Sequence, residues 1–468
     1  MSVQEKIYSH APLWLQTAMI SLKGLEFETK RVKKKSALEH CNFLLESQFW
    51  SKDQIHNYQN QMLSVILKEA FLNVPYYQKL SSELKCDYRD FKTVEDVRLL
   101  PFLEKKQIRA NELQFVNQKI PINKLNTGFT SGTTGTPLKL YSNRSIFSRR
   151  WAFELRLRNW AGLKDIYHPR RVQFTGRDII PINNKQKVYW RYNMPANTLH
   201  CSTSHIDVTT AIHYAKAISA FKPDFIDGYP SAISTLSKIC FSKNYSLPKV
   251  TAIRVSAETL YEEDREIIQK AFGGKVFNQY GSSESSSFCS ENAFGEMLVH
   301  PEFGLFEILY QKNDQGAADG FGEVVTTSFI NPVMPLIRYK IGDLVKVGNV
   351  VSSVYGKNFL RLDSVMGRTD DILPIAGRGF IGRLDPIFKG ATGIYESQII
   401  LENSDLLTVN IVPDNSWSRL YEEKLVNKLR QKVGNEIKIE MVLMGNIPRG
   451  PNGKFPAVID NTKKTING

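Results

Sequence analysis

The stretch that decides how this chain folds is Thr130-Ser131-Gly132-Thr133-Thr134-Gly135-Thr136-Pro137-Leu138-Lys139. Its glycines let the backbone turn N–H groups toward an anion, and its hydroxyl side chains add donors, so it predicts a phosphate-binding loop. Leu140 and Tyr141 continue it with apolar residues, which indicates a loop between two strands and not a helix start. The stretch lacks the Gly-Lys-Ser/Thr ending of a Walker loop, which disfavours an ordinary P-loop kinase or ATPase. By itself, such a run is equally compatible with a flexible polar linker.

Four further motifs follow in order along the chain. They are Tyr280-Gly281-Ser282-Ser283-Glu284, Arg338-Tyr339-Lys340-Ile341-Gly342-Asp343-Leu344, Gly367-Arg368-Thr369-Asp370-Asp371 and Ile447-Pro448-Arg449-Gly450-Pro451-Asn452-Gly453-Lys454-Phe455. Together with the opening loop, this order closely resembles the adenylate-forming superfamily of acyl-CoA synthetases, peptide-synthetase adenylation domains and luciferases. Each motif is weak alone, whereas five in the same order over most of the chain are not explained by coincidence.

The resemblance narrows to one branch. Val74-Pro75-Tyr76-Tyr77 and Leu99-Leu100-Pro101-Phe102-Leu103, followed by two lysines, resemble the lead-in of the phenylacetate–coenzyme A ligases. The tail departs from those enzymes, because Ala376-Gly377-Arg378-Gly379 and Ile394-Tyr395-Glu396-Ser397-Gln398-Ile399-Ile400 stand where they usually carry a Pro-Ser-Gln-Ile-Glu-like string. This tail resembles the capsular-polysaccharide-biosynthesis members of the branch. The departure weighs against coenzyme A as the final acceptor.

Composition predicts a cytoplasmic protein of more than one domain. A chain of 468 residues is too long for one ordinary core. The five cysteines are odd in number and scattered, which fits a reducing compartment. No run of about 18 apolar residues is present, and the amino terminus lacks the small-residue cleavage site of a secretion signal. Cys289 and His300 are candidate zinc ligands, but a set of four ligands is not visible.

The net charge of +14 has three readings. It includes the run Lys30-Arg31-Val32-Lys33-Lys34-Lys35 and several arginines between Arg149 and Arg177. A solvated face, acidic small substrates, and an anionic membrane surface or lipid-linked sugar all fit. Nucleic acid is disfavoured, because no reading motif or aromatic-interleaved basic strip accompanies the charge.

The pattern of elements predicts an α/β fold with a large and a small domain. Residues 1–110 read as a mostly helical lead-in, with one helix over Gln54–Leu72. Further on, strands and helices alternate, with strands at 225–227, 250–256 and 275–278, Ser231 and Thr259 as helix caps, and a helix end at Gly273. This β-α-β alternation predicts parallel sheets with ligand groups at the carboxyl ends of the strands. Residues 300–366 are strand-rich and predict a β-rich subdomain.

The small domain is predicted from Asp370 onward. A strand at 406–412, a helix at 418–433 and a strand at 437–443 indicate an α+β unit. We therefore expect a large adenylate-forming domain over 1–369 and a mobile lid domain over 370–468. The stretch from Gly377 to Gly382 satisfies Gly-x-Gly-x-x-Gly, but Pro386 and Gly390 break the helix a dinucleotide site needs, so a hairpin is expected there.

The resemblance implies ATP and Mg²⁺ as cofactors. The loop residues supply neutral donors to the β- and γ-phosphates, Tyr280 flanks adenine, and the carboxylate of Asp343 suits the two ribose hydroxyls. Glu284 is a hard oxygen ligand of the kind Mg²⁺ prefers. The expected nucleotide-binding residues are Thr130, Ser131, Gly132, Thr133, Thr134, Gly135, Ser256, Ala257, Glu258, Tyr280, Gly281, Ser282, Ser283, Asp343 and Arg368.

Lys454 is the strongest catalytic candidate, and Arg368 and Thr130 are the other two candidates. A positioned ammonium stabilises the negative charge that develops at the α-phosphorus during adenylation. The resemblance places this lysine on the mobile lid and makes Asp370 the hinge. The lid is expected to rotate away before the acceptor attacks.

The acid pocket is expected where relatives bind their carboxylate. Its candidate residues are Gln173, Phe174, Arg177, Ser204, His205 and Tyr229. His205 fits a packed histidine as well as it fits a base. The arginines in this region favour a polar acid, such as a uronate sugar or an amino acid, over an aryl acetate.

These features predict an ATP-dependent ligase that forms an acyl-adenylate and pyrophosphate, then transfers the acyl group to an amine or a sugar-linked group in surface-polysaccharide assembly. An acyl-CoA ligase of the phenylacetate type is the first alternative. The second is a non-catalytic scaffold with the same fold. The scaffold is disfavoured because Glu284, Asp343 and Lys454 are all present, with Arg368 as a fourth motif residue.

Overall fold

The structure is a computed structural model, and it describes most of the chain. The described residues are 3–27, 29, 34–130, 138–176, 179–180, 187–310, 321–349, 353–368, 373–375, 379–381, 388, 393–450 and 453–462. The chain divides into two units, each built from separate stretches of sequence. The first unit is Met1–Ile20, Pro169–Val276 and Gly367–Gly468, and the second is Ser21–His168 and Phe277–Met366.

A five-stranded sheet lies at the centre of the first unit, in the order β7-β6-β3-β5-β4. Its strands are parallel except β4, which pairs antiparallel with β5. Apolar side chains on one face pack against helices α8, α9 and α10 in a single core. The elements of this part are α1 (Val3–His10), α2 (Leu13–Glu26, which continues into the second unit), β3 (Arg171–Phe174), β4 (Trp190–Asn193), β5 (Thr198–Cys201), α8 (Ala211–Phe221), β6 (Phe225–Gly228), α9 (Pro230–Ser242), β7 (Ala252–Ser256) and α10 (Glu262–Phe272).

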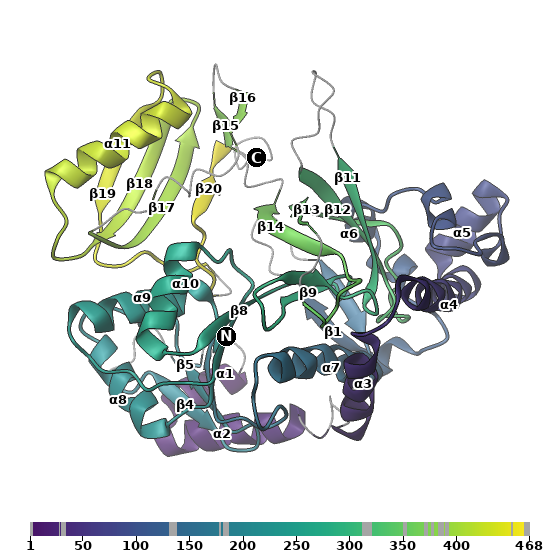
Figure 1. Cartoon of the computed structure of the whole chain (residues 1–468), viewed down its shortest axis with the longest axis horizontal. Coiled ribbons are helices and arrows are strands. Elements are labelled where there is room, and N and C mark those ends of the chain that lie inside the picture. The colour runs from purple at the N-terminus through teal and green to yellow at the C-terminus, as the bar shows by residue number, and fades with distance from the viewer. Residues whose placement is uncertain are drawn as a thin grey trace. The chain divides into compact units, whose positions relative to one another are not determined.

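The carboxyl-terminal part of the first unit is a separate four-stranded sheet, in the order β19-β18-β17-β20. Figure 1 shows α11 lying across this sheet, and its apolar residues share a core with β17 and β18. The expected strand, helix and strand of the lid are present within one or two residues of their predicted bounds. A short hairpin precedes them, as predicted. The elements are β15 (Leu373–Ile375), β16 (Gly379–Ile381), β17 (Ile394–Asn403), β18 (Leu406–Pro413), α11 (Arg419–Val433), β19 (Lys438–Leu443) and β20 (Val458–Asp460).

The second unit combines the helical lead-in with a sheet in the order β11-β12-β13-β14-β10-β9-β8. The helical elements are α3 (Lys34–Ser47), α4 (Lys52–Asn73), α5 (Pro75–Leu84), η2 (Tyr88–Asp90), η3 (Asp96–Leu99), α6 (Lys105–Ala110), η4 (Glu112–Phe115), η5 (Ile122–Lys124) and α7 (Arg144–Trp160). The strands are β1 (Asn126–Phe129), β2 (Lys139–Ser142), β8 (Lys275–Gly281, which begins in the first unit), β9 (Phe288–Glu291), β10 (Met297–Val299), β11 (Gly304–Tyr310), β12 (Phe321–Ser328), β13 (Tyr339–Val347) and β14 (Arg361–Arg368, which ends in the first unit).

Local chemistry explains the helix starts. Helix α4, predicted over Gln54–Leu72, begins after Ser51, whose side chain accepts from the Gln54 backbone while the Gln54 side chain accepts from Ser51. Two predicted caps are wrong. Helix α9 starts two residues earlier than expected, because Pro230 occupies its first turn and Tyr229 precedes it, so Ser231 lies inside the helix. Helix α10 starts only at Glu262, too far along the chain for Thr259 to cap it.

One of the branch motifs, Leu99–Leu103, meets the superfamily motif that begins at Arg338 in the second unit. The Leu103 backbone N–H donates to Arg338 O at 3.0 Å, and Lys340 N–H donates to Leu103 O at 2.9 Å. The Arg338 guanidinium donates to Glu307 Oε1 at 3.0 Å and to Leu100 O at 2.7 Å. The lead-in is therefore fastened to the segment that carries Asp343.

Candidate active site

Thr130 closes the base of the predicted phosphate loop. Strands β1 and β2 form an antiparallel hairpin, as expected from the apolar residues that flank the loop. Beyond the last strand pair, Thr130 N donates to Leu138 O at 3.0 Å, and Leu138 N donates to Thr130 Oγ1 at 2.9 Å. Thr130 is buried. Its side chain thus joins the two ends of the segment between residues 130 and 138.

Tyr280 and Asp343, predicted to contact adenine and ribose, touch each other. The Tyr280 hydroxyl donates to Asp343 Oδ2 at 2.6 Å, which joins the end of β8 to β13. Burial, and then the charge of Asp343, hold the pKa of Tyr280 well above its usual value. The hydroxyl is therefore protonated and fixes one oxygen of the carboxylate.

Glu284 lies in the turn that follows β8. Ser282 Oγ lies 2.8 Å from Ser286 Oγ and accepts from Ser286 N at 3.1 Å, which closes this turn. Glu284 is buried, and its Oε1 accepts from the Tyr339 hydroxyl at 3.0 Å. Tyr339 begins the same strand that carries Asp343, so two motif acids are held by one strand.

The surroundings of Glu284 fit a magnesium ion. Mg²⁺ usually takes one or two carboxylate ligands and completes its shell with water and phosphate oxygens. Glu284 offers a carboxylate oriented by Tyr339. The nearby Arg150 donates to Ser285 Oγ at 3.3 Å; burial lowers its pKa, and the charge of Glu284 opposes that shift.

In the first unit, the loop that carries Lys454 lies against the carboxyl ends of β3 and β5. A Cβ on Gly453 would stand 2.4 Å from Gly176 Cα and 3.1 Å from Thr203 Oγ1, so the two backbones are in close contact. Gly453 also has φ +62°, a conformation that favours glycine. Gly450 N donates to Lys454 O at 2.9 Å, which tightens the loop. Lys454 therefore lies next to the segments that hold the predicted acid pocket.

Glu258 follows β7 and contacts that same loop. Its Oε1 accepts from the Phe455 backbone N–H at 2.6 Å, and its Oε2 accepts from Ser231 N–H at 3.3 Å. Ala257 before it has φ +71°, a turn that redirects the chain at the end of the strand. Burial raises the pKa of Glu258, and the two backbone donors oppose that rise.

Sequence analysis named only one member, Gln173, of a charged cluster centred on Asp227. Arg254 Nε and Nη2 both donate to Asp227 Oδ1, at 2.9 and 2.6 Å. Gln173 Nε2 donates to Asp227 Oδ2 at 3.1 Å, and Arg171 Nη1 lies 3.6 Å from the same oxygen. Asp227 is buried, with 1% of its side chain exposed, so its charge is shared between two guanidiniums. The signal in the sequence was the presence of polar residues within three largely apolar strands: Arg171 and Gln173 in β3, Asp227 in β6 and Arg254 in β7.

The structure also describes four other predicted pocket residues, Phe174, Ser204, His205 and Tyr229. Tyr229 N donates to Phe174 O at 2.9 Å. His205 Nδ1 lies 2.7 Å from Ser202 Oγ, and its ring stacks on Tyr189 at 5.5 Å between centroids. Its Nε2 is buried with no hydrogen-bond partner among the described residues. Ser204 is exposed.

Several predicted site residues fall outside the described part of the chain. They are Ser131, Gly132, Thr133, Thr134, Gly135, Arg177 and Asp370. Arg368 ends β14, and its side chain is not described. Of the remaining nucleotide-site residues, Gly281 and Ser283 are exposed at the end of β8, and Ser256 ends β7. The roles of all these residues stay predictions.

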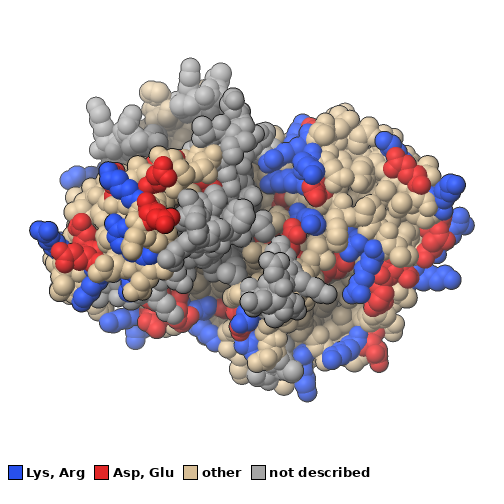
Figure 2. Space-filling model, turned by 90° about the horizontal axis from the view of Figure 1, so that it is seen from above, with Lys and Arg blue, Asp and Glu red and all other residues tan. Residues whose placement is uncertain are grey.

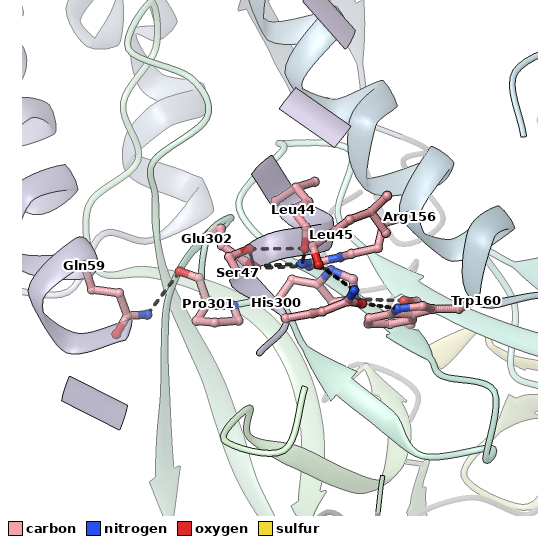
Figure 3. Close-up of polar contacts among 11 residues, drawn as sticks. Leu44, Leu45, Ser47, Gln59, Arg156, Trp160, His300, Pro301 and Glu302 are labelled. Carbon is pink, nitrogen blue, oxygen red and sulfur yellow. Dashed lines mark hydrogen bonds and ion pairs between the residues drawn. The ribbon is translucent and has the colours of Figure 1, made fainter. Parts of the chain in front are cut away.

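The candidate zinc ligand His300 lies in a buried network of polar side chains. His300 contacts Arg156 through Nδ1 (Figure 3). Its Nε2 lies 2.8 Å from Ser290 Oγ, so both ring nitrogens have partners. Arg156 also pairs with Glu302 at 2.7 Å. Among the described residues, no group of three or more His, Cys, Asp or Glu side chains is placed to hold a metal.

Comparison with known proteins identifies the family. Residues 376–461 match the family model described as the CapK C-terminal domain. The chain is 30% identical to Protein CapK of Staphylococcus aureus over 98% of its own length and 99% of that protein. It is 23% identical to phenylacetate-coenzyme A ligase of Thermus thermophilus, over 88% of this chain and 98% of that protein.

The fold agrees with these sequence matches. The structure is similar to 2-hydroxyisobutyryl-CoA ligase in the postadenylation state, with a TM-score of 0.69 and 18% identity over 90% of this chain and 93% of that one. The predicted mixed α/β adenylate-forming fold is confirmed, and the chain is similar to AMP-forming acyl-CoA ligases in sequence and fold. The chain belongs to the CapK family, a relative of the phenylacetate–coenzyme A ligases within the adenylate-forming superfamily.

Proposed function

We propose that this protein is an ATP-dependent ligase that activates a carboxylic acid as an acyl-adenylate and then transfers the acyl group to an acceptor. The observation that carries this proposal is the position of the Lys454 loop, which lies on Gly176 and Thr203 beside the predicted acid pocket. A family member with this lysine next to its acid-binding segments has the cation that adenylation needs.

In the first step, a carboxylate oxygen of the acid attacks the α-phosphorus of ATP. The bond between the α-phosphorus and the bridging oxygen to the β-phosphate breaks, and pyrophosphate leaves. The Lys454 ammonium stabilises the negative charge on the α-phosphate oxygens during this displacement. In the second step, the acceptor attacks the acyl carbon, loses its proton, and AMP leaves.

The nucleotide roles of the motif residues are part of this proposal. The loop from Thr130 to Gly135 binds phosphate, Tyr280 flanks adenine, and Asp343 binds ribose. The hydrogen bond between Tyr280 and Asp343 supports one shared nucleoside site. Glu284 would hold Mg²⁺, which when bound neutralises phosphate charge. The orientation of its carboxylate by Tyr339 supports this assignment.

The acid is proposed to be polar, such as a uronate sugar or an amino acid. Support comes from the Asp227 cluster, where the polar side chains of Gln173, Arg171 and Arg254 gather at one buried carboxylate. The ring of an aryl acetate would offer these polar side chains no hydrogen-bonding group.

The acceptor is proposed to be an amine or a sugar-linked group in surface-polysaccharide assembly. Support comes from the tail, which matches the CapK C-terminal domain model and departs from the phenylacetate-type pattern. Coenzyme A is the alternative, because curated relatives of this chain are named phenylacetate-coenzyme A ligases. Offering amino sugars, amino acids and coenzyme A to the preformed adenylate, with mass spectrometry of products, separates them. Rapid, saturable formation of an acyl-CoA with no transfer to amines would overturn this preference.

The test of adenylation itself is acid-dependent exchange of labelled pyrophosphate into ATP. We expect exchange with at least one acid from a panel of amino, uronic, aryl and fatty acids. The scaffold alternative is tested separately by calorimetry, since a protein without a nucleotide site would bind neither ATP nor AMP.

A peripheral contact with an anionic membrane or lipid-linked sugar is also proposed. Trp14, Leu22 and Leu25 are 71%, 66% and 49% exposed and fall on one side of α2, just before the basic run at 30–35. Figure 2 shows basic and acidic side chains interspersed on the described surface of the face drawn, so the net charge of +14 carries the attraction. Among the described residues, no helix is long and apolar enough to cross a bilayer. Cosedimentation with phosphatidylglycerol vesicles should fall on Trp14→Ala, and no binding by the wild type would contradict the proposal.

A further inference from the structure

We propose that Glu258 is a positioning residue whose carboxylate holds the Lys454 loop in the arrangement used for adenylation. The inference deepens the proposed function and rests on it for the meaning of Lys454. It assigns the Glu258 side chain a contact with the loop, whereas the family resemblance implied a role in the nucleotide site.

The contact is made at the residue next to the catalytic lysine. The Phe455 backbone N–H donates to Glu258 Oε1 at 2.6 Å, a short charge-assisted hydrogen bond. The acceptor comes from the end of β7 and the donor lies 197 residues further along the chain. Fixing the backbone of Phe455 also limits where the side chain of Lys454 can reach.

Glu258 is itself anchored by the body of the first unit. Its second oxygen accepts from Ser231 N–H, at 3.3 Å, in the first turn of α9. The positive end of that helix favours a carboxylate at this place. Both carboxylate oxygens of Glu258 therefore accept hydrogen bonds from backbone N–H groups. These bonds hold the side chain near the carboxyl end of β7.

Other contacts hold the same small sheet but act further from the lysine. Glu396 on β17 pairs with Arg449 and accepts from Thr235 Oγ1 at 2.8 Å, and the Tyr395 hydroxyl lies 2.7 Å from Ser242 Oγ. These contacts anchor β17 and the start of the loop to α9. Glu258 differs because its partner, Phe455, is adjacent to Lys454.

When the loop moves away for the second step, Glu258 loses Phe455 and keeps Ser231. The half-buried carboxylate then has one backbone donor fewer, so the resting protein is biased toward the seated loop. A displacement of about 1 Å at a catalytic group can cost on the order of a hundredfold in rate, so this bond is expected to affect the first step and spare the second.

The first test needs no substrate. Spin labels at Lys216→Cys on α8 and Lys424→Cys on α11, both exposed positions, report the distance between the two sheets of the first unit in a Cys86→Ser background. The Glu258→Ala variant should show a broader and longer distance distribution than the parent. Asp264→Ala is the matched control, because Asp264 bonds to Ser234 and Lys238 and makes no described contact with the small sheet. An unchanged distribution in Glu258→Ala would overturn the proposal.

The second test uses whichever acid supports pyrophosphate exchange. Glu258→Ala should reduce exchange about tenfold or more, within the hundredfold noted above. Transfer from chemically prepared acyl-adenylate should be unchanged, and Glu258→Gln, which keeps one acceptor oxygen, should recover part of the exchange. Equal loss in both steps would overturn a positioning role. If no acid supports exchange, the proposed function fails while the distance measurement still decides the role of Glu258.

Discussion

Two sets of charged side chains in this protein, one around Arg156 and one around Glu258, differ in what they contact. Around Arg156, an ion pair with Glu302, a hydrogen bond to Leu44 O at 2.9 Å and the ring of His300 enclose the guanidinium completely (Figure 3). Glu258 is only half-buried, and one of its two donors belongs to the loop of Lys454. The first set joins α3, α7 and the segment after β10, whereas we propose that the second is broken when the Lys454 loop moves. The difference suggests that the Arg156 set maintains the fold, whereas Glu258 acts on the position of the Lys454 loop.

The largest effect is expected from a substitution in the charged set around Arg156. Arg156→Met should lower the free energy of unfolding by about 3–5 kcal/mol, because Glu302 would remain buried without its partner. Urea denaturation measures this change. Lys35→Met, which removes an exposed ion pair with Glu39, is the control and should leave the denaturation midpoint unchanged. If the two variants behave alike, the Arg156 network does not stabilise the fold.

Lys454→Ala tests the other region. It should lower acid-dependent pyrophosphate exchange on the order of a hundredfold or more, because the charge at the α-phosphorus loses its cation. Transfer from a supplied acyl-adenylate should be largely retained, and the denaturation midpoint should not move. Loss in both half-reactions would show that the lysine has another role or that its removal disturbs the small sheet.

Gly453→Ala should disturb the contact between the Lys454 loop and Gly176 without removing a charge. The new Cβ would meet Gly176 Cα at 2.4 Å, in a backbone conformation that disfavours alanine. We expect exchange to fall roughly tenfold, because a loop displaced by about 1 Å misplaces Lys454. Gly445→Ala is the matched control, since its Cβ would meet nothing within 4 Å. Normal pyrophosphate exchange by Gly453→Ala would mean that adenylation does not need this contact with Gly176.

Thr235→Val is expected to have the smallest effect. It removes the hydrogen bond to Glu396 but leaves the ion pair of Glu396 with Arg449. The free energy of unfolding should fall by about 1 kcal/mol, with exchange nearly unchanged. A large loss of exchange would place the critical anchor at Glu396 and weaken the case for Glu258.

The ordered motifs were enough to predict the superfamily and its α/β fold, and the local pattern predicted the carboxyl-terminal strands and helix, because each is encoded in a short stretch. The helix caps at Ser231 and Thr259 were wrong, because Pro230 and the position of Glu262 decide where those helices begin. Asp227 and Arg254 were missed because only the parallel register of β6 and β7 brings these isolated residues together. No local pattern could link Glu258 to Phe455, since tertiary packing alone joins them.

The measurement that tests the central claim most directly is pyrophosphate exchange by the full-length protein, with the acid panel, ATP and Mg²⁺. The account predicts exchange that depends on a polar acid and falls on the order of a hundredfold or more in Lys454→Ala. Failure of the wild type to exchange label or release AMP with any acid in the panel, while it remains folded, would contradict the claim that this protein forms acyl-adenylates.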